Sequence, residues 1–298
     1  MAHKVPSKKT TVETFQPRLT SARRFDAQDW DVLGLPALGA AFESRRTAWN
    51  EQFAEGQFVV PKFRRRPNRP KSRPKLTLTY APESSGYWCG GIAIPEVGDR
   101  MEWVEGQWSA PQVALPADAD SGQSYILSSW VGMDGDYGSD DVLQAGCDAT
   151  VVLVNGITQH QCQPWWQWYP GQSQTIDGVA ISPGDLINCK IVVTPGSSSS
   201  ARIVFSNLTT GRHCAFGVTS PTLGIALAGR SAEWIVEAFG TLGPIARFST
   251  VEFDNCYSGT LNGETISAGQ GTTIQMMAPS GAIAASASLS GPASVRIT

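Results

Sequence analysis

Short runs in which apolar and polar residues alternate follow one another from residue 76 to the end of the chain. Gly, Pro, Ser or Asn separate these runs, which is the pattern of β-strands joined by turns. No long stretch after residue 76 shows a helical period. The expected strands are Leu76–Tyr80, Gly91–Ile94, Arg100–Trp108, Thr150–Val154, Trp165–Tyr169, Leu186–Thr194, Ala201–Leu208, Glu233–Glu237, Ala246–Phe253, Thr272–Met277 and Ala293–Thr298.

Many short strands without long helices predict an all-β fold, namely an antiparallel β-sandwich of two large sheets in the jelly-roll or concanavalin-like class. We expect this domain to cover residues 76–298. A basic amino-terminal segment, partly helical or disordered, is expected over residues 1–75. Within it, Leu38–Phe53 carries Ala, Phe and Trp residues at roughly helical spacing, which predicts a short helix.

The stretch from Ser128 to Asp148 is expected to be a strand, a loop and a second strand. Gly and Asp crowd the part from Asp134 to Asp141, and an apolar run resumes at Val142. Gln144 therefore lies inside the second strand. A primary amide between apolar neighbours needs hydrogen-bond partners, which either the fold or a substrate could supply.

Charge is divided unevenly along the chain. Residues 1–75 carry 16 Lys and Arg against 7 Asp and Glu, which is a net charge of +9 (16 − 7), and residues 76–298 carry 7 against 19, a net charge of −12 (7 − 19). The basic run Phe63–Lys75 is expected to be a solvated tether. A second interpretation is an inhibitory or processing segment that covers the acidic domain. Nucleic-acid or membrane contact is least favoured, because the run has neither interleaved aromatic residues nor an amphipathic helix.

Several classes of protein are poorly supported. The chain has no apolar run of about twenty residues, and its first residues lack the apolar core of a signal peptide. It has only three His and no Gly-x-Ser-x-Gly, which disfavours a serine triad. Asp120-Ser-Gly is expected to be a turn rather than an aspartic-protease motif. Asp134-x-Asp136 begins like a calcium loop, but Ala145 stands where that loop needs Glu.

Six cysteines lie after residue 76, at Cys89, Cys147, Cys162, Cys189, Cys214 and Cys256. They allow up to three disulfides with fifteen connectivities, and buried free thiols are an equal alternative. No Cys-x-x-Cys occurs, and His and Cys are too sparse for a zinc site, so no metal is expected.

Two further runs carry candidate chemistry. In Pro164–Pro170, four aromatic residues fall within five positions, so Trp166 and Trp168 must face opposite to Trp165, Gln167 and Tyr169. One face is core, and the other could be core or a platform for sugars or extended peptides.

In Ala232–Glu237, alternation places Glu233, Ile235 and Glu237 on one face of a strand. A carboxylate within an apolar strand is rarely buried without a partner.

These motifs together resemble the glutamic peptidases, the G1 or eqolisin family, over roughly residues 80–298. The resemblance is carried, in order and at about the family's spacing, by Tyr87-Trp-Cys-Gly-Gly, Val104-Glu-Gly-Gln-Trp-Ser-Ala-Pro, Trp130-Val-Gly-Met-Asp-Gly-Asp, Val142-Leu-Gln-Ala-Gly-Cys-Asp, Trp165-Trp-Gln-Trp-Tyr-Pro and Ala232-Glu-Trp-Ile-Val-Glu. The family fold is a sandwich of two large antiparallel sheets.

The resemblance implies an acid-acting endopeptidase that uses a glutamine–glutamate dyad without cofactor, metal or covalent intermediate. Gln144 corresponds to the catalytic glutamine, which stabilises the oxyanion, and Glu233 to the catalytic glutamate, which activates water. Residues at family positions that contact substrate or support the cleft are Trp130, Asp134, Asp148, Trp165 and Tyr169.

The resemblance also implies polypeptide substrates, a monomer and secretion to the extracellular space, with no nucleic-acid or membrane partner. The chain departs from the family at Gln167, where the family has Glu, and at Trp88, which is followed by one residue more than in the family pattern. The alternative is a catalytically weak sandwich that binds carbohydrate or peptide. The two hypotheses are distinguished by whether the side chains of Gln144 and Glu233 face one open groove.

Overall fold

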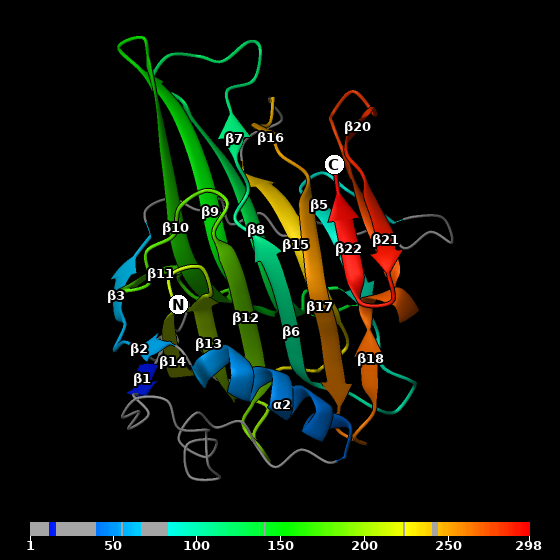
Figure 1. Ribbon diagram of the computed structural model, residues 1–298. Coiled ribbons are helices and arrows are strands. Elements are labelled where there is room, and N and C mark those ends of the chain that lie inside the picture. Colours follow the sequence, from blue (N-terminus) through cyan, green and yellow to red (C-terminus); the bar gives the residue numbers. More distant parts are fainter. Residues whose placement is uncertain are drawn as a thin grey trace, which may run out of the picture.

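The computed structural model describes residues 12–15, 40–54, 56–66, 83–136, 138–139, 141–222, 224–239 and 244–298. Two large, mainly antiparallel sheets stack face to face (Figure 1), so the expected β-sandwich is confirmed. The first, sheet A, follows the order β1 (Val12–Phe15), β14 (Arg212–Thr219), β13 (Ser200–Asn207), β12 (Leu186–Val193), β6 (Met101–Ser109), β17 (Val251–Thr260), β22 (Ser294–Ile297) and β21 (Ala287–Gly291), with β2 (Gln57–Phe58) beside β14 and β18 (Thr265–Ser267) beside β17.

Sheet B carries the motifs that the sequence singled out. Its order is β20 (Ile283–Ala285), β19 (Thr272–Met277), β5 (Trp88–Ala93), β15 (Ala232–Phe239), β8 (Ser124–Asp134), β9 (Val142–Val154), β10 (Ile157–Tyr169), β11 (Gln174–Asp177) and β3 (Lys62–Arg65), with β4 (Glu83–Ser85) beside β19. A separate small pair is made of β7 (Val113–Ala114) and β16 (Arg247–Phe248), and a short 3-10 turn, η1, covers Ala268–Gln270.

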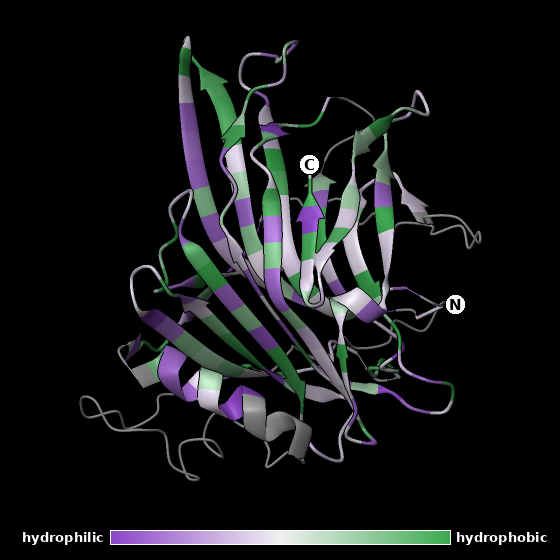
Figure 2. Cartoon of the chain, turned by 45° about the vertical axis from the view of Figure 1, so that its right-hand side comes forward, coloured by the Kyte–Doolittle hydropathy of each residue, from purple (hydrophilic) through white to green (hydrophobic). Residues whose placement is uncertain are grey.

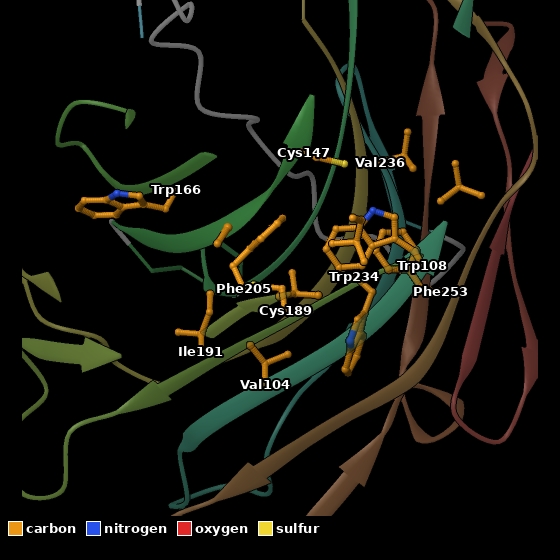
Figure 3. Close-up of a cluster of buried hydrophobic side chains, with 14 of the residues drawn as sticks. Val104, Trp108, Cys147, Trp166, Cys189, Ile191, Phe205, Trp234, Val236 and Phe253 are labelled. Atoms are coloured by element: carbon orange, nitrogen blue, oxygen red, sulfur yellow. The ribbon is translucent and has the colours of Figure 1, made fainter. Parts of the chain in front are cut away.

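The main core lies between the two sheets (Figure 3). Side chains of sheet A and sheet B meet there, and they come from alternate positions along each strand. The labelled members from sheet A are Val104, Trp108, Cys189, Ile191, Phe205 and Phe253, and those from sheet B are Cys147, Trp166, Trp234 and Val236. Figure 2 shows the corresponding alternation of hydrophobic and hydrophilic bands along the strands.

The predicted amino-terminal helix is confirmed as α2 (Ala40–Ala54), which lies across the outer face of sheet A in Figure 1. Trp49 and Phe53 of α2 are buried against Trp103 and Val192 of the sheet. Burying two large aromatic side chains is worth a few kcal/mol, which fixes the helix on the sheet although its two faces differ little in polarity.

Beneath α2 lies a buried ionic cluster. Glu105 of β6 accepts hydrogen bonds from Arg45 at 2.8 Å and from the Trp49 indole at 2.8 Å, and Lys190 of β12 lies 3.3 Å from Glu105. Burial alone would raise the pKa of Glu105, but Lys190 and Arg45 hold it below its ordinary value. The helix therefore contributes both apolar contact and a charge to the sheet.

The solvated tether predicted for Phe63–Lys75 is wrong for its first residues. Lys62–Arg65 forms the edge strand β3, which pairs with β11, and Arg66 is only 8% exposed. Pairing with the edge of sheet B satisfies the backbone hydrogen-bonding groups of this basic run, and the long charged side chains of β3 stay exposed to solvent. The rest of that run, and the expected strand Leu76–Tyr80, fall outside the described residues.

Three other expectations changed in detail. Val142–Gln144 and Thr150–Val154 belong to one long strand, β9. The expected strand Ala246–Phe253 is broken between β16 and β17. The strand β14 was not expected.

All six cysteines are free thiols, and five of them are buried. In the part of the chain that the structure describes, no helix is long and apolar enough to cross a membrane.

Candidate active site

Glu233 and Gln144 lie in one row across three neighbouring strands of sheet B. Glu233 of β15 is paired with Gly132 of β8, and Gly132 is paired with Gln144 of β9. Neighbouring strands lie about 4.8 Å apart, so the two Cα atoms are separated by roughly 10 Å. Side chains of this length, pointing to the same side, can reach one small group placed between them.

Both side chains leave the main core. Leu143 and Ala145, on either side of Gln144, belong to the core between the sheets, as do Ala232 and Trp234 on either side of Glu233. Because side chains alternate along a strand, Gln144 and Glu233 project from the opposite face of sheet B. We call this the active face; its apolar members are Trp88, Ile92, Trp130, Trp165, Ile235 and Ile274.

Gly132 keeps the middle of the row open. A Cβ atom built on it would lie 2.7 Å from the Trp130 ring, which is closer than real contacts allow. The glycine therefore lets the Trp130 indole cover the backbone of β8, and it places no side chain between Gln144 and Glu233. Sequence reasoning missed this residue, although Val131-Gly-Met within an apolar strand is a recognisable sign of a close approach.

Glu233 is fully buried, and neither of its carboxylate oxygens has a well-formed hydrogen bond among the described residues. Burial raises the pKa of Glu233 well above its ordinary value; the nearby Ser231 hydroxyl opposes this rise, and the negative charges of Asp134 and Asp136 add to it. An unsatisfied buried carboxyl group is costly to the fold. Such a group, close to other acids, is typical of a site prepared for a substrate or water.

Gln144 is held from the other side of the row. Its Nε2 donates to Oε1 of Gln167 at 3.4 Å, and Nε2 of Gln167 donates to the carbonyl of Gly171 at 2.9 Å. Oε1 of Gln144 has no partner among the described residues. These two hydrogen bonds in series assign Nε2 of Gln144 to the side that faces Gln167. Since Nε2 carries two N–H groups, the second one can donate to a ligand.

Asp134 ends β8 and braces the approach to β15. Its carboxylate accepts hydrogen bonds from the backbone N–H groups of Ala228, Gly229 and Arg230, at 2.7, 3.1 and 2.7 Å. Burial raises the pKa of Asp134 to about 6, against the effect of these donors, which lowers it. The residue lies at φ 66°, a conformation that Asp tolerates better than most residues. It thus holds the segment that leads into Glu233.

The aromatic residues of the active face are positioned by hydrogen bonds. The Trp130 indole donates to Glu237 at 3.0 Å, and the Trp165 indole donates to Ser128 at 3.1 Å. Trp88 packs edge-on against Trp130, with ring centroids 5.0 Å apart, so it lies on the active face despite the longer motif that follows it.

Trp166 and Trp168 lie in the core and Trp165 on the active face, which confirms the alternation expected for Trp165–Tyr169. Tyr169 and Gln167 are half-buried.

Asp148 forms an ion pair with Arg66, which comes from the basic amino-terminal segment. Asp148 and Arg66 are 4% and 8% exposed. The predicted residues Gln144, Glu233, Trp130, Asp148 and Trp165 thus share one face. Arg66 was missed, because a run of basic residues before the domain gives no indication of which acidic partner it meets.

Comparison with known proteins agrees with this fold. The model of the Peptidase A4 family matches residues 86–298. The chain belongs to the peptidase A4 family, the family of glutamic peptidases. Aspergillopepsin-2 of Aspergillus niger is 31% identical over 258 residues, which is 80% of this chain and 87% of that protein.

Solved structures of relatives agree as well. Scytalido-glutamic peptidase with a transition state analog inhibitor has a TM-score of 0.59 at 27% identity, covering 72% of this peptidase and 98% of that chain. An Eqolisin-family peptidase in complex with the tripeptide Ala-Ile-His has a TM-score of 0.55 at 26% identity, over the same shares of both chains. Among the described residues of this peptidase, no group of three or more His, Cys, Asp and Glu could hold a metal ion.

Proposed function

We propose that this peptidase hydrolyses internal peptide bonds of polypeptides in acid, with Glu233 and Gln144 acting as a dyad. The observation that carries the proposal is the row Glu233–Gly132–Gln144, which aims both functional groups at one space on the active face. Shared orientation favours catalysis over the alternative of a binding module, since a module would not need a buried, unsatisfied carboxyl group there.

Glu233 is proposed as the general base and then the general acid. As carboxylate it takes a proton from a water molecule that attacks the scissile carbonyl, and it returns that proton to the leaving amine. A raised pKa makes Glu233 a stronger base than an ordinary glutamate. It also means that the rate falls at low pH once Glu233 is protonated.

Gln144 is proposed to stabilise the oxyanion of the tetrahedral intermediate. Its amide can donate one N–H to the substrate oxygen while the other is held by Gln167. An oxyanion donor of this kind is worth about 10²–10³ in turnover. Asp134, with its pKa of about 6, ionises as the pH rises toward neutrality and adds negative charge near the developing oxyanion. Ionisation of Asp134 would therefore set the upper end of the pH range of activity, whereas protonation of Glu233 sets the lower end, which the raised pKa of Glu233 moves toward neutral pH.

The remaining predicted residues are proposed to receive or support the polypeptide. Trp130, Trp165 and Tyr169 supply aromatic surface for an extended chain, Asp134 braces the loop before Glu233, and Asp148 supplies charge. Relatives solved with a transition state analog and with a tripeptide support a polypeptide substrate. We also propose that the enzyme is monomeric and acts outside the cell.

The test uses a denatured protein substrate between pH 2 and pH 7, with cleaved bonds identified by mass spectrometry. Glu233→Gln should abolish turnover, because it is nearly isosteric but removes the base. Gln144→Ala should lose about 10²–10³ in turnover. Glu252→Gln, which alters a carboxylate on sheet A, is the matched control and should retain full activity. Substantial turnover by Glu233→Gln would refute the dyad.

A further inference from the structure

The hairpin of β9 and β10 carries sheet B beyond the sandwich. In Figure 1 the two strands run side by side to a tip that lies past β12 and β13 of sheet A. The turn at the tip is Asn155-Gly156, and both residues have a positive φ, 50° and 76°. Positive φ at both positions defines the type I′ turn, which holds two strands in one register. The pairing of β9 with β10 accordingly has no register shift along its whole length.

The turn decides which backbone groups of β10 point away from β9. The two residues that flank such a turn exchange both backbone hydrogen bonds, so Ile157 directs its N–H and C=O toward β9, and every second residue after it does the same. The residues between them, Thr158, His160 and Cys162, direct these groups to the other side. Each of the three therefore presents one donor and one acceptor at the outer edge of β10.

No described strand pairs with these groups. The next strand of sheet B, β11, pairs with β10 only at Trp165 and Trp166. Pro164 ends the open stretch, because it has no N–H and its carbonyl accepts a hydrogen bond from Nε2 of Gln163 at 3.2 Å. Between the turn and Pro164, the outer edge of β10 is thus open among the described residues, and residues 157–161 are exposed.

This edge lacks the features that protect most sheet edges. Folded proteins guard their edges with charged residues, with Pro or with a β-bulge, because unpaired N–H and C=O groups bind other extended chains. The stretch Ile157-Thr-Gln-His-Gln-Cys has no Lys, Arg, Asp, Glu or Pro, and its pairing with β9 contains no bulge. It therefore keeps the capacity to add one more strand.

We propose that the outer edge of β10 from Ile157 to Cys162 is a second binding site for the polypeptide substrate, which pairs with it as an added β-strand. The site rests on the proposed function, because it names how the same substrate is held. It is continuous with the active face, since Gln167 of β10 lies opposite Gln144. At about 3.4 Å per residue, Cys162 and Thr158 lie roughly 17 and 31 Å from Gln167 along the strand. An extended substrate covers this distance with about five to nine residues.

An unfolded polypeptide suits this edge better than a second folded copy. Stable protein interfaces bury about 1,200–2,000 Å², whereas the exposed large apolar side chain of this edge is that of Ile157 alone. Pairing would rest on a few backbone hydrogen bonds, each worth about 0.5–1.5 kcal/mol. That is too little for a dimer. It is enough for a chain already held at the active face, because tethering raises the effective concentration of its distal part to about the millimolar range.

Backbone hydrogen bonds also suit the substrates of a peptidase. They supply affinity without reading side chains, so an edge of this kind accepts extended segments of varied sequence.

The first experiment compares substrates of different length on the full chain. Short peptides contain the cleavable bond and end about three residues from it, and long peptides extend about twelve residues on one side or the other, far enough to reach the edge. We expect extension on one side to raise kcat/KM about tenfold through KM, with kcat unchanged, because the added binding is equal in the ground and transition states.

His160→Pro removes the outward N–H in the middle of the edge, at a position where an edge strand tolerates Pro. It should lose most of the advantage of the long peptide and cleave the short peptide at the wild-type rate, which shows that it is folded. His160→Thr is the matched control, since it removes the imidazole but keeps the N–H, and it should keep the advantage. Thr158→Pro repeats the test at the neighbouring outward position.

The second experiment observes the edge without catalysis. Amide hydrogen exchange is followed by NMR in full-chain Glu233→Gln, alone and with reduced, carboxymethylated ribonuclease A, which cannot fold. The amides of Thr158, His160 and Cys162 should exchange rapidly in the protein alone and become protected by the unfolded chain. The amides of Gln159 and Gln161, which bond to β9, are the internal control and should be protected in both samples.

An equal advantage of the long peptide in the wild type and in His160→Pro, or no added protection by the unfolded protein, would overturn the second site. Protection of the three outward amides in the protein alone would also overturn it, because the edge would then be occupied by a second copy or by another part of the chain. Substantial turnover by Glu233→Gln would refute the proposed catalysis, whereas protection of the same amides would still support the edge.

Discussion

Replacing Asp134 by asparagine tests the electrostatics of the site through stability. Asp134 accepts three backbone hydrogen bonds from the segment 228–230, and an amide offers only one acceptor atom. Losing such bonds costs about 1–3 kcal/mol. The cost should depend on pH, because the pKa of Asp134 is raised by burial from 3.8 to about 6.

The sign follows from linkage. A carboxyl group whose pKa is raised in the folded protein stabilises the fold below its unfolded pKa and loses that contribution as pH rises through the folded pKa. A rise from 3.8 to about 6 corresponds to roughly 3 kcal/mol, at 1.36 kcal/mol for each unit of pKa. The amide of the Asp134→Asn variant does not titrate and has no such dependence. The stability advantage of the wild type over Asp134→Asn should therefore shrink by that amount between pH 3.5 and pH 7.5.

Guanidinium chloride unfolding of the full chain at both pH values measures this difference. Asp118→Asn, at an exposed aspartate before β8, is the matched control and should follow the wild type at both pH values. An advantage that stays constant, or grows toward pH 7.5, would refute the assignment of Asp134 as a buried carboxyl group that resists ionisation.

Three other contacts give predictions of their own. Gln167→Leu should lower kcat about three- to tenfold with little change in KM, because it removes the side chain that orients Gln144. Gln167→Asn should recover less than the full rate. A KM that changes as much as kcat does would contradict a positioning role. In thermal melts, Glu105→Gln should lower the free energy of unfolding by about 3–5 kcal/mol, because Lys190 is left buried without its carboxylate partner. A decrease of less than about 1 kcal/mol would contradict the buried ion pair. Burial and the charge of Lys190 lower the pKa of His213 to about 4, so the contact of His213 with Phe53 and Phe58 should weaken as pH falls from 6.5 to 4. The hydrogen-exchange protection of Ala40–Ala54 should therefore decrease over that pH range. The decrease should be smaller in the His213→Phe variant.

The sequence predicted the faces of the strands well, because alternation is a local property. Trp166 and Trp168 in the core, Trp165 on the other face, and Glu233 and Ile235 on one side of β15 all follow from a period of two. The class of fold followed from the number of such runs.

The sequence could not show which strands become neighbours. Gly132 lies between Glu233 and Gln144 only because β8 pairs with both β15 and β9, and Glu233 is about a hundred positions from Gly132 along the chain. The same limit explains Arg66. Its basic run has the composition of a tether, and only the pairing of β3 with β11 at the edge of sheet B brings it to Asp148. Long-range pairing, rather than local propensity, decides both contacts.

A double-mutant cycle shows whether Glu233 and Gln144 act on the same bond as one unit. Cleavage of a single peptide is measured for the wild type, Glu233→Gln, Gln144→Ala and the double variant under single-turnover conditions. Gln144→Ala should cost about 10²–10³ in the wild type and clearly less in Glu233→Gln, because residues that act as a unit in one step contribute non-additively. Independent losses that multiply, or a Glu233→Gln enzyme within tenfold of the wild type, would contradict it.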